Sequence, residues 1–233
     1  MRLLLILLLT ALSLPVFAAD KETAFDRVMR TQTLRCGYYT FPPMVQRDVK
    51  TGVLSGFSVD MMNALGARAG LKIEWTEEVT FGNWVPALQS RRFDAVCAPM
   101  WPEIAMAKAV AFTDPLFFAG LSPLVRADDA RFKEGSLARL NQPDVTFLTQ
   151  DGNAIDMLTR EFFPNAKIKT MPASVSGPAV LQEIVTKKAD AILLDRNGEV
   201  EYNKNNPAKL KLIDTPHPVK VQPFALVVGR DEM

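Results

Sequence analysis

The sequence predicts an α/β fold in which mainly parallel sheets carry helices on both faces. Short apolar strands alternate with helical segments twice, over residues 34–98 and again over residues 145–213. Such alternation favours parallel strands joined by crossover helices. In both series a helix that begins Pro-Ala leads into a strand that begins Asp-Ala, at residues 86–95 and 178–191. The repeat indicates two similar lobes facing each other across a cleft, unless it is a coincidence of common helix and strand residues.

The composition is that of a globular protein with enough apolar residues for a sizeable core. The chain has 233 residues, of which 48% are hydrophobic and 23% charged. The first 18 residues hold one arginine and no acid, so the remainder has 26 basic and 26 acidic residues. This neutral balance argues against a nucleic-acid partner.

The N-terminus has the pattern of a secretory signal. Met1-Arg2 is followed by a Leu-rich apolar run to Val16, and Val16-Phe17-Ala18 is typical of a cleavage site. We therefore expect residues 1–18 to be a cleaved signal peptide and the protein to be periplasmic. The alternative is an uncleaved anchor, for which the apolar run is short.

In the first series, we expect strands over residues 34–38, 71–75 and 95–98. Ser58 is placed to cap a helix that Gly70 ends, and Asn83 to cap a helix over residues 84–89. A small helix is expected after Glu103, through about residue 109.

In the second series, the expected strands are residues 121–127, 145–148, 167–170, 191–194, 210–213 and 224–228. The expected helices are residues 154–162, 178–187 and 198–203.

The end of the third strand is the first place to look for a site. We expect this strand to leave the sheet at Pro99, because proline cannot continue a central strand. Ligands bind outside the carboxyl ends of strands in open α/β sheets. Trp101, held between Pro99 and Pro102, is therefore a candidate site wall, although it could equally cap the core.

The two cysteines, Cys36 and Cys97, fall within expected strands. An oxidising compartment permits a disulfide between them. We favour two buried thiols, since the geometry of a bridge between strands is demanding. Their spacing is not that of a zinc site, and neither a metal nor a cofactor is expected.

Several segments, in this order and spacing, resemble periplasmic solute-binding proteins of the type II fold, in the polar-amino-acid family. The resemblance runs from about Thr33 to the end of the chain. The matching segments are Leu34-Arg35-Cys36-Gly37, Pro42-Pro43, Gly56-Phe57-Ser58-Val59-Asp60, Val85-Pro86-Ala87-Leu88-Gln89, Phe93-Asp94-Ala95, Phe112-Thr113-Asp114-Pro115, Phe163-Pro164-Asn165-Ala166 and Asp190-Ala191-Ile192-Leu193-Leu194-Asp195.

The resemblance implies two lobes, the first formed by residues 19–122 and 218–233 and the second by residues 123–217. Hinges would lie near residues 121–127 and 215–222, and the lobes would close on a solute. The closed monomer would then dock on an ABC permease in the inner membrane.

The resemblance also implies roles for particular residues. Asp195 matches the acid that takes the ligand's amino group, although it could instead cap a helix. Gly152 and Asn153 match the segment whose backbone N–H groups hold the ligand carboxylate, with simple capping by Asn153 as the alternative. The candidates for the apolar and aromatic wall are Tyr39, Phe41, Phe57, Trp84, Met100 and Trp101.

Two departures from the family set this sequence apart. The family arginine that grips the α-carboxylate falls on Ile104 or Met106, and Lys108 cannot reproduce its planar fork. Glu103 adds an acid near the cleft, so we expect a more apolar and less anion-seeking site. The chain also stops at Met233, where the family usually continues with C-terminal helices, so we expect either a truncated sequence or a thinner first lobe.

The leading hypothesis is a receptor for a small amine-bearing solute, with no catalytic residues. An enzyme on the same fold, such as a cyclohexadienyl dehydratase, would need a positioned acid, and only Glu103 and Asp195 could pair for that role. The lone His217 lies between prolines and does not suit a catalytic triad. A sensory module that signals through a membrane partner is the third possibility.

Overall fold

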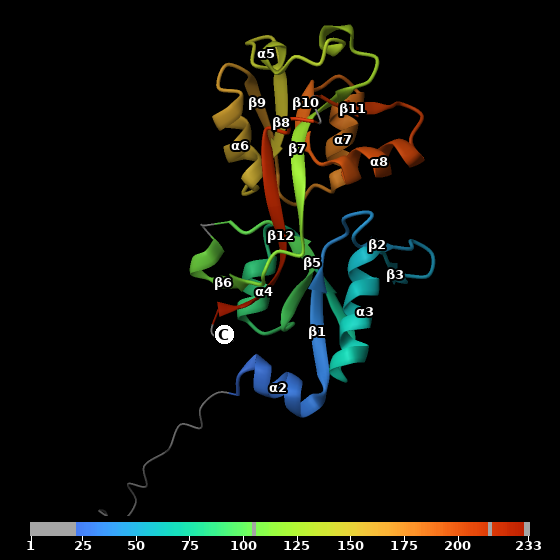
Figure 1. Ribbon diagram of the computed structural model, residues 1–233, viewed down its shortest axis with the longest axis vertical. Helices are drawn as coiled ribbons and strands as arrows, with labels where there is room; N and C mark the ends of the chain where they lie inside the picture. Colours follow the sequence, from blue (N-terminus) through green and yellow to red (C-terminus); the bar gives the residue numbers. More distant parts are fainter. Residues whose placement is uncertain (1–21, 104–105, 214–215, 231–233) are drawn as a thin grey trace, which may run out of the picture.

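The protein folds into two lobes connected by two long strands, as the computed structural model shows (Figure 1). The structure describes residues 22–103, 106–213 and 216–230. The predicted signal peptide, residues 1–18, lies outside these ranges. Lobe 1 contains the segments up to β6 with the end of β12, and lobe 2 contains the segments from the end of β7 to β11.

Lobe 1 has three parallel strands at its centre, in the order β4-β1-β5. Its helices are α2 (Ala24–Thr31), α3 (Phe57–Ala69) and α4 (Trp84–Gln89), and a short 3-10 turn, η2, spans Met106–Lys108. Its strands are β1 (Thr33–Tyr38), β2 (Gln46–Arg47), β3 (Leu54–Ser55), β4 (Lys72–Glu78), β5 (Ala95–Met100) and β6 (Val110–Phe112).

Helices cover both faces of β5, because its side chains alternate between two apolar clusters. Val96 and Met100 pack with Trp84 of α4, whereas Ala95 and Cys97 pack with Met62 of α3. All six residues of β5 are buried. The predicted helices on both faces are therefore confirmed for this lobe.

The prediction that β5 leaves the sheet at Pro99 is wrong, because the strand continues to Met100. β1 pairs with β5 only at Ala95 and Val96, and Met100 is held by Ala225 of β12 on the other side. Pro99 therefore lies beyond the β1 ladder, where a missing N–H donor disrupts no bond to that strand. Consequently, Trp101 follows the strand directly.

Lobe 2 repeats this plan with three strands in the order β10-β8-β9, which are parallel. Its elements are η3 (Ala130–Phe132), α5 (Leu137–Leu140), β8 (Thr146–Gln150), α6 (Ala154–Phe162), β9 (Lys167–Met171), α7 (Gly177–Val185), β10 (Ala191–Leu194), α8 (Arg196–Asn205) and β11 (Leu210–Leu212). Leu193 packs with Leu158 of α6, while Ile192 packs with Ile184 of α7 and Tyr202 of α8. Helices therefore cover both faces of this sheet too.

The lobes are joined by β7 (Phe117–Arg126) and β12 (Lys220–Gly229), which run side by side (Figure 1). They pair antiparallel from Phe117 opposite Phe224 to Leu121 opposite Lys220. The remainder of β7 pairs with β10 and β11 of lobe 2, and the remainder of β12 pairs with β5 and β6 of lobe 1. The domain boundaries at 122/123 and 217/218 and the two hinge ranges stay predictions.

The expectation of two free thiols is wrong: Cys36 and Cys97 form a disulfide between β1 and β5. Cys36 lies opposite Ala95, so Cys97 is its diagonal neighbour on the same face of the sheet. Their Cα atoms are 5.4 Å apart, within the range that a disulfide requires. The parallel register of β1 against β5 thus brings the two cysteines to disulfide distance, which the sequence alone does not specify.

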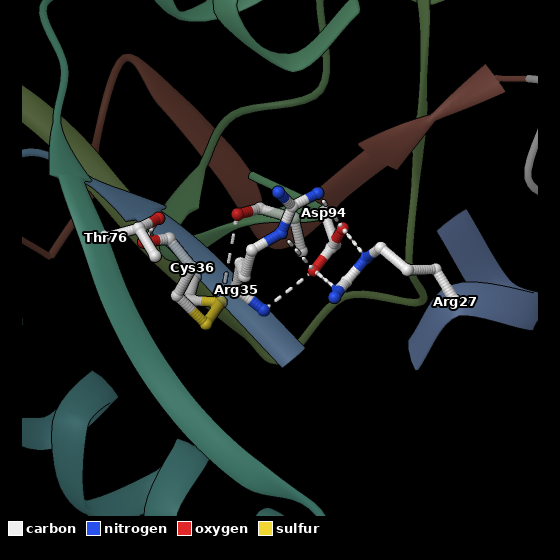
Figure 2. Close-up of a disulfide and its surroundings, with 7 residues drawn as sticks. Arg27, Arg35, Cys36, Thr76 and Asp94 are labelled. Carbon is white, nitrogen blue, oxygen red and sulfur yellow. Dashed lines mark hydrogen bonds and ion pairs between the residues drawn. A yellow bond between two sulfur atoms is a disulfide. The ribbon is translucent and has the colours of Figure 1, made fainter. Parts of the chain in front are cut away.

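In each lobe an aspartate directly before one parallel strand, β5 or β10, ties that strand to its parallel neighbour. In lobe 1 the backbone N–H of Arg35 donates to the Asp94 carboxylate at 2.7 Å, and the Asp94 N–H donates to the Arg35 carbonyl at 2.9 Å. Figure 2 shows the Arg27 and Arg35 side chains converging on the same carboxylate. In lobe 2 the same exchange joins Thr146 and Asp190, at 2.9 and 2.8 Å. The Asp-Ala repeat in the sequence therefore corresponds to one structural device used twice.

Two helix starts differ from the prediction. Ser58 lies inside α3, whose N-cap is Gly56, and its buried hydroxyl has no partner among the described residues. Helix α2 was not predicted, although Thr23 caps it by accepting from the Asp26 N–H at 3.0 Å. The Thr-x-x-Asp spacing was the signal for that start. No helix in the described part of the chain is both long and apolar enough to cross a membrane.

Candidate ligand-binding site

A cavity of about 440 Å³ is lined by residues of both lobes. The carboxyl ends of β1 and β5 contribute from lobe 1, and the ends of β8 and β10 contribute from lobe 2. This is the edge of a parallel sheet at which α/β proteins bind ligands. Of the nine predicted site residues, six line it: Tyr39, Phe41, Met100, Trp101, Asn153 and Asp195.

Three aromatic rings from lobe 1 form one wall of the cavity. The ring centroids of Tyr39 and Phe81 are 5.4 Å apart, and those of Tyr39 and Phe41 are 6.0 Å apart. The Tyr39 hydroxyl donates to the carbonyl of Pro99, which fixes the ring against β5. Burial raises the pKa of Tyr39, and the charge of Asp195 adds to this effect, so the acid lies near this wall.

Trp101 connects the two lobes at the end of β5. Its ring packs edge-on against Phe224, with centroids 5.6 Å apart, and it also contacts the apolar core of lobe 2. Its buried indole N–H has no partner among the described residues. Trp101 therefore lines the cavity and also contributes to the contact between the lobes, while its role in binding a ligand stays a prediction.

Asp195 brings a carboxylate into the cavity from the end of β10. Only 2% of the residue is exposed, and its Oδ1 accepts from the Gly198 N–H at 3.0 Å, so it also caps α8. Burial raises the pKa of Asp195 above its ordinary value, while hydrogen bonds from the N–H groups of Gly198 and Asn197 oppose the shift. The helix cap considered from the sequence is therefore present, and the same side chain also lines the cavity. Its contact with the amino group of a ligand stays a prediction.

Glu103 reaches from lobe 1 to the start of a lobe 2 helix. Its Oε1 accepts from the N–H of Ala154, the first residue of α6, at 3.3 Å. Burial raises the pKa of Glu103, and the bond from Ala154 opposes the shift. Asn153 caps the same helix by accepting from the Ile155 N–H at 3.0 Å. The backbone N–H groups of Ala154 and Ile155 are therefore engaged by the chain itself, and that of Asn153 donates to the Gln150 carbonyl at 3.2 Å. The role expected for the Gly152 and Asn153 segment in holding a ligand carboxylate stays a prediction.

The charged side chains that line the cavity in the described part of the chain are all acids: Glu103, Asp195 and Glu201. Met106, one of the two positions expected for the family arginine, lines the cavity, and Ile104 lies outside the described residues. Lys108 is exposed and lies in a separate hollow with Arg91 and Arg230. The cavity therefore combines an aromatic wall with negative charge.

Three predicted site residues lie outside the cavity lining. Trp84 is 1% exposed and belongs to the core between α4 and β5. Phe57 is half exposed and packs edge-on against Phe117, which in turn stacks on Phe224. Gly152 is exposed in the turn before α6, with a left-handed φ of 71° that favours glycine.

Other residues that line the cavity were not predicted from the sequence. Phe224 was expected in a strand but not in a site, and Phe81 was given no role. Gln150 ends β8, so the strand-end argument applied to Trp101 and Asp195 would have identified it. Tyr202 and Glu201 lie on α8 and had no such signal. Among the residues described, no three His, Cys, Asp or Glu side chains are arranged to hold a metal ion.

Comparison with solved structures supports the fold and its relationships. An ancestral amino-acid-binding protein, AncCDT-1, described as a precursor of cyclohexadienyl dehydratase, aligns with a TM-score of 0.75 and 30% identity, covering 91% of this chain and 87% of that one. Holo ArgBP from T. maritima aligns with a TM-score of 0.73, covering 89% and 87%, and at 23% identity this shows a shared fold.

Sequence relatives carry binding-protein names. The L-arginine-binding protein of Pseudomonas aeruginosa is 28% identical over 195 residues, which cover 81% of this chain and 66% of the relative. A probable amino-acid ABC transporter-binding protein of Haemophilus influenzae is 30% identical over 128 residues, covering 54% and 49%. The chain thus spans between about half and two thirds of the length of these curated relatives.

The sequence profile of the bacterial extracellular solute-binding proteins, family 3, matches residues 34–216, which is most of the chain. Together with the two-lobed fold and the cavity at the strand ends, this match shows that the chain belongs to that family.

Proposed function

We propose that the protein is a periplasmic receptor that captures a small amine-bearing solute between its lobes and delivers it, as a monomer, to an ABC permease. The observation that carries this proposal is the buried carboxylate of Asp195 at the end of β10, facing a cavity with an aromatic wall. A charge-assisted hydrogen bond from an ammonium to such a carboxylate contributes about 1.5–3 kcal/mol.

The size and lining of the cavity suit a metabolite rather than a macromolecule. About 440 Å³ lies within the range of small-molecule sites. The rings of Tyr39, Phe41 and Phe81 offer faces that attract a cation. Relatives named as amino-acid-binding proteins support a solute-binding role over an enzymatic one.

The connection between the lobes supports closure as the capture mechanism. In the part of the chain that the structure describes, the paired strands β7 and β12 connect the lobes (Figure 1). Trp101 and Glu103 add contacts from lobe 1 to lobe 2 beside the cavity. A solute that contacts both lobes would bind the closed arrangement more tightly than the open one and would therefore favour closure.

The proposal is tested by titrating the purified chain with amino acids, polyamines and quaternary amines in a calorimeter, with thermal shift as a second readout. We expect at least one amine to bind and to raise the melting temperature. In Asp195→Asn, which retains a capping side chain, that affinity should fall roughly 10- to 150-fold. Binding of no member of the panel would contradict the proposal.

A further inference from the structure

We propose that the Glu103 carboxylate occupies the position that a solute carboxylate would need at the start of α6, so that the cavity selects small cations that carry an amine but no carboxylate. This inference rests on the proposed function and specifies its class of solute.

The first turn of α6 has its donors engaged within the chain. The N–H of Ala154 donates to Glu103 at 3.3 Å, that of Ile155 to the Asn153 side chain at 3.0 Å, and that of Asp156 to the Asn153 carbonyl at 3.0 Å. A helix start binds an anion through N–H groups that lack other acceptors. A solute carboxylate would therefore have to displace Glu103 to use the start of α6.

The acidic lining of the cavity also disfavours a solute carboxylate. Glu103, Asp195 and Glu201 all line it, and no lysine, arginine or histidine is among the lining residues in the described part of the chain. A solute carboxylate brought into this partly buried space is repelled by these three acids, because the interaction between charges is stronger at low dielectric than in water. A cation gains from the same acids.

The aromatic side of the cavity completes a site for a cation. Tyr39 lies within 6.0 Å, centroid to centroid, of both Phe41 and Phe81, and its hydroxyl is held by Pro99. Fixed ring faces attract an ammonium or guanidinium group. Thus the acids and rings recognise the positive end of a solute, while Glu103 excludes an anionic end from α6.

The test compares amino acids with the amines that remain when the carboxylate is removed. The pairs are lysine and cadaverine, ornithine and putrescine, arginine and agmatine, and histidine and histamine. For the pair that binds most tightly, we expect the native chain to prefer the amine by about tenfold or more. Glu103→Gln removes the charge and Glu103→Ala also vacates the start of α6. Both should lower this ratio, Glu103→Ala more strongly.

Glu201→Gln is the matched control, because it removes a cavity acid that lies on α8 and not at α6. It should weaken binding of the amine and lower the preference for the amine less than either Glu103 variant does, because it removes charge from the cavity without changing the start of α6. A native chain that binds the amino acid as tightly as the amine, or an unchanged ratio in both Glu103 variants, would overturn the inference and leave the proposed function standing. Binding of no member of any pair and of no solute in the wider panel would overturn both.

Discussion

The strands β5 and β10 begin alike and end differently. Asp94 and Asp190 each exchange two hydrogen bonds with the neighbouring strand, one through the backbone N–H and one through the side-chain carboxylate, and both hold arginine side chains. At the other end, β5 leads into Trp101 and Glu103, whereas β10 leads into the buried acid Asp195. The aspartates at the starts of the two strands therefore hold the sheets together. The ends of the strands differ, and they bring Trp101 and Glu103 from lobe 1 and Asp195 from lobe 2 to one cavity.

The lobes also differ in that lobe 1 contains a disulfide. The Cys36–Cys97 disulfide closes a loop with a sequence separation of 61 residues in lobe 1, and lobe 2 contains no cysteine. A loop of that length stabilises the folded state by about 4 kcal/mol in the chain-entropy account. We expect Cys36→Ala with Cys97→Ala to lower the free energy of unfolding by that order, as measured by urea titration.

Hydrogen exchange in the same double variant shows which strands lose stability when the disulfide is removed. Amides of β1 and β5 should lose protection first, while those of β8 and β10 keep theirs. Equal losses in both lobes would show that the lobes unfold as one unit and that the link does not act on lobe 1 alone.

The two anchoring aspartates should differ in how much they stabilise the fold. The Asp94 side chain is 3% exposed, so Asp94→Asn leaves Arg27 and Arg35 without a charged partner at that position and should cost about 1.5–3 kcal/mol. Asp190→Asn should cost about 1 kcal/mol, because Arg126 and Arg131 both keep Asp129. Urea titration of both variants measures the difference, and a larger loss for Asp190→Asn would reverse this ranking.

Substitution of Asp195 should affect the stability of the fold and the affinity for the solute differently. Its raised folded-state pKa means that burial disfavours the ionised form, so its stabilising contribution is present at low pH and is lost as pH rises through that pKa. Asp195→Asn removes the charge and keeps a cap for α8. Its melting temperature at neutral pH should therefore equal or exceed that of the native chain, although its affinity for the solute falls. A clear loss of stability would assign Asp195 a mainly structural role.

Affinity for an amine should weaken as the pH falls. Burial raises the pKa of both Asp195 and Glu103 above their ordinary values of 3.8 and 4.5, and a cation prefers the ionised carboxylates. Protonation of these acids therefore removes attraction, beginning at a higher pH than for exposed carboxyl groups. Calorimetry between pH 7 and pH 4 should show falling affinity and proton release on binding, and a pH-independent affinity would argue against a carboxylate contact.

Much of the fold could be predicted from the sequence, because apolar periodicity and turn residues determine where its elements lie. The helix over residues 154–162 and the strand over residues 191–194 were predicted with the bounds that the structure shows. The continuation of β5 through Pro99 could not be predicted, since it depends on which strand pairs where. The disulfide likewise required the register of β1 against β5.

The site was only partly predictable, for a related reason. Trp101 and Asp195 follow strands and could be identified by the strand-end rule. Phe81 and Tyr202 reach the cavity only through the tertiary placement of a loop and a helix. The contact of Glu103 with Ala154 depends on how the lobes face each other, which no local pattern specifies.

The most direct test of an aromatic and acidic amine site is calorimetric titration of Trp101→Ala and Lys108→Ala with the amine that binds the native chain most tightly. Loss of the Trp101 ring removes apolar and cation contacts worth about 1–3 kcal/mol, so affinity should fall roughly 5- to 150-fold. Lys108→Ala should leave affinity within about twofold, because this side chain is exposed and lies outside the cavity lining. A larger loss in Lys108→Ala than in Trp101→Ala would contradict the account and indicate a site that grips an anion.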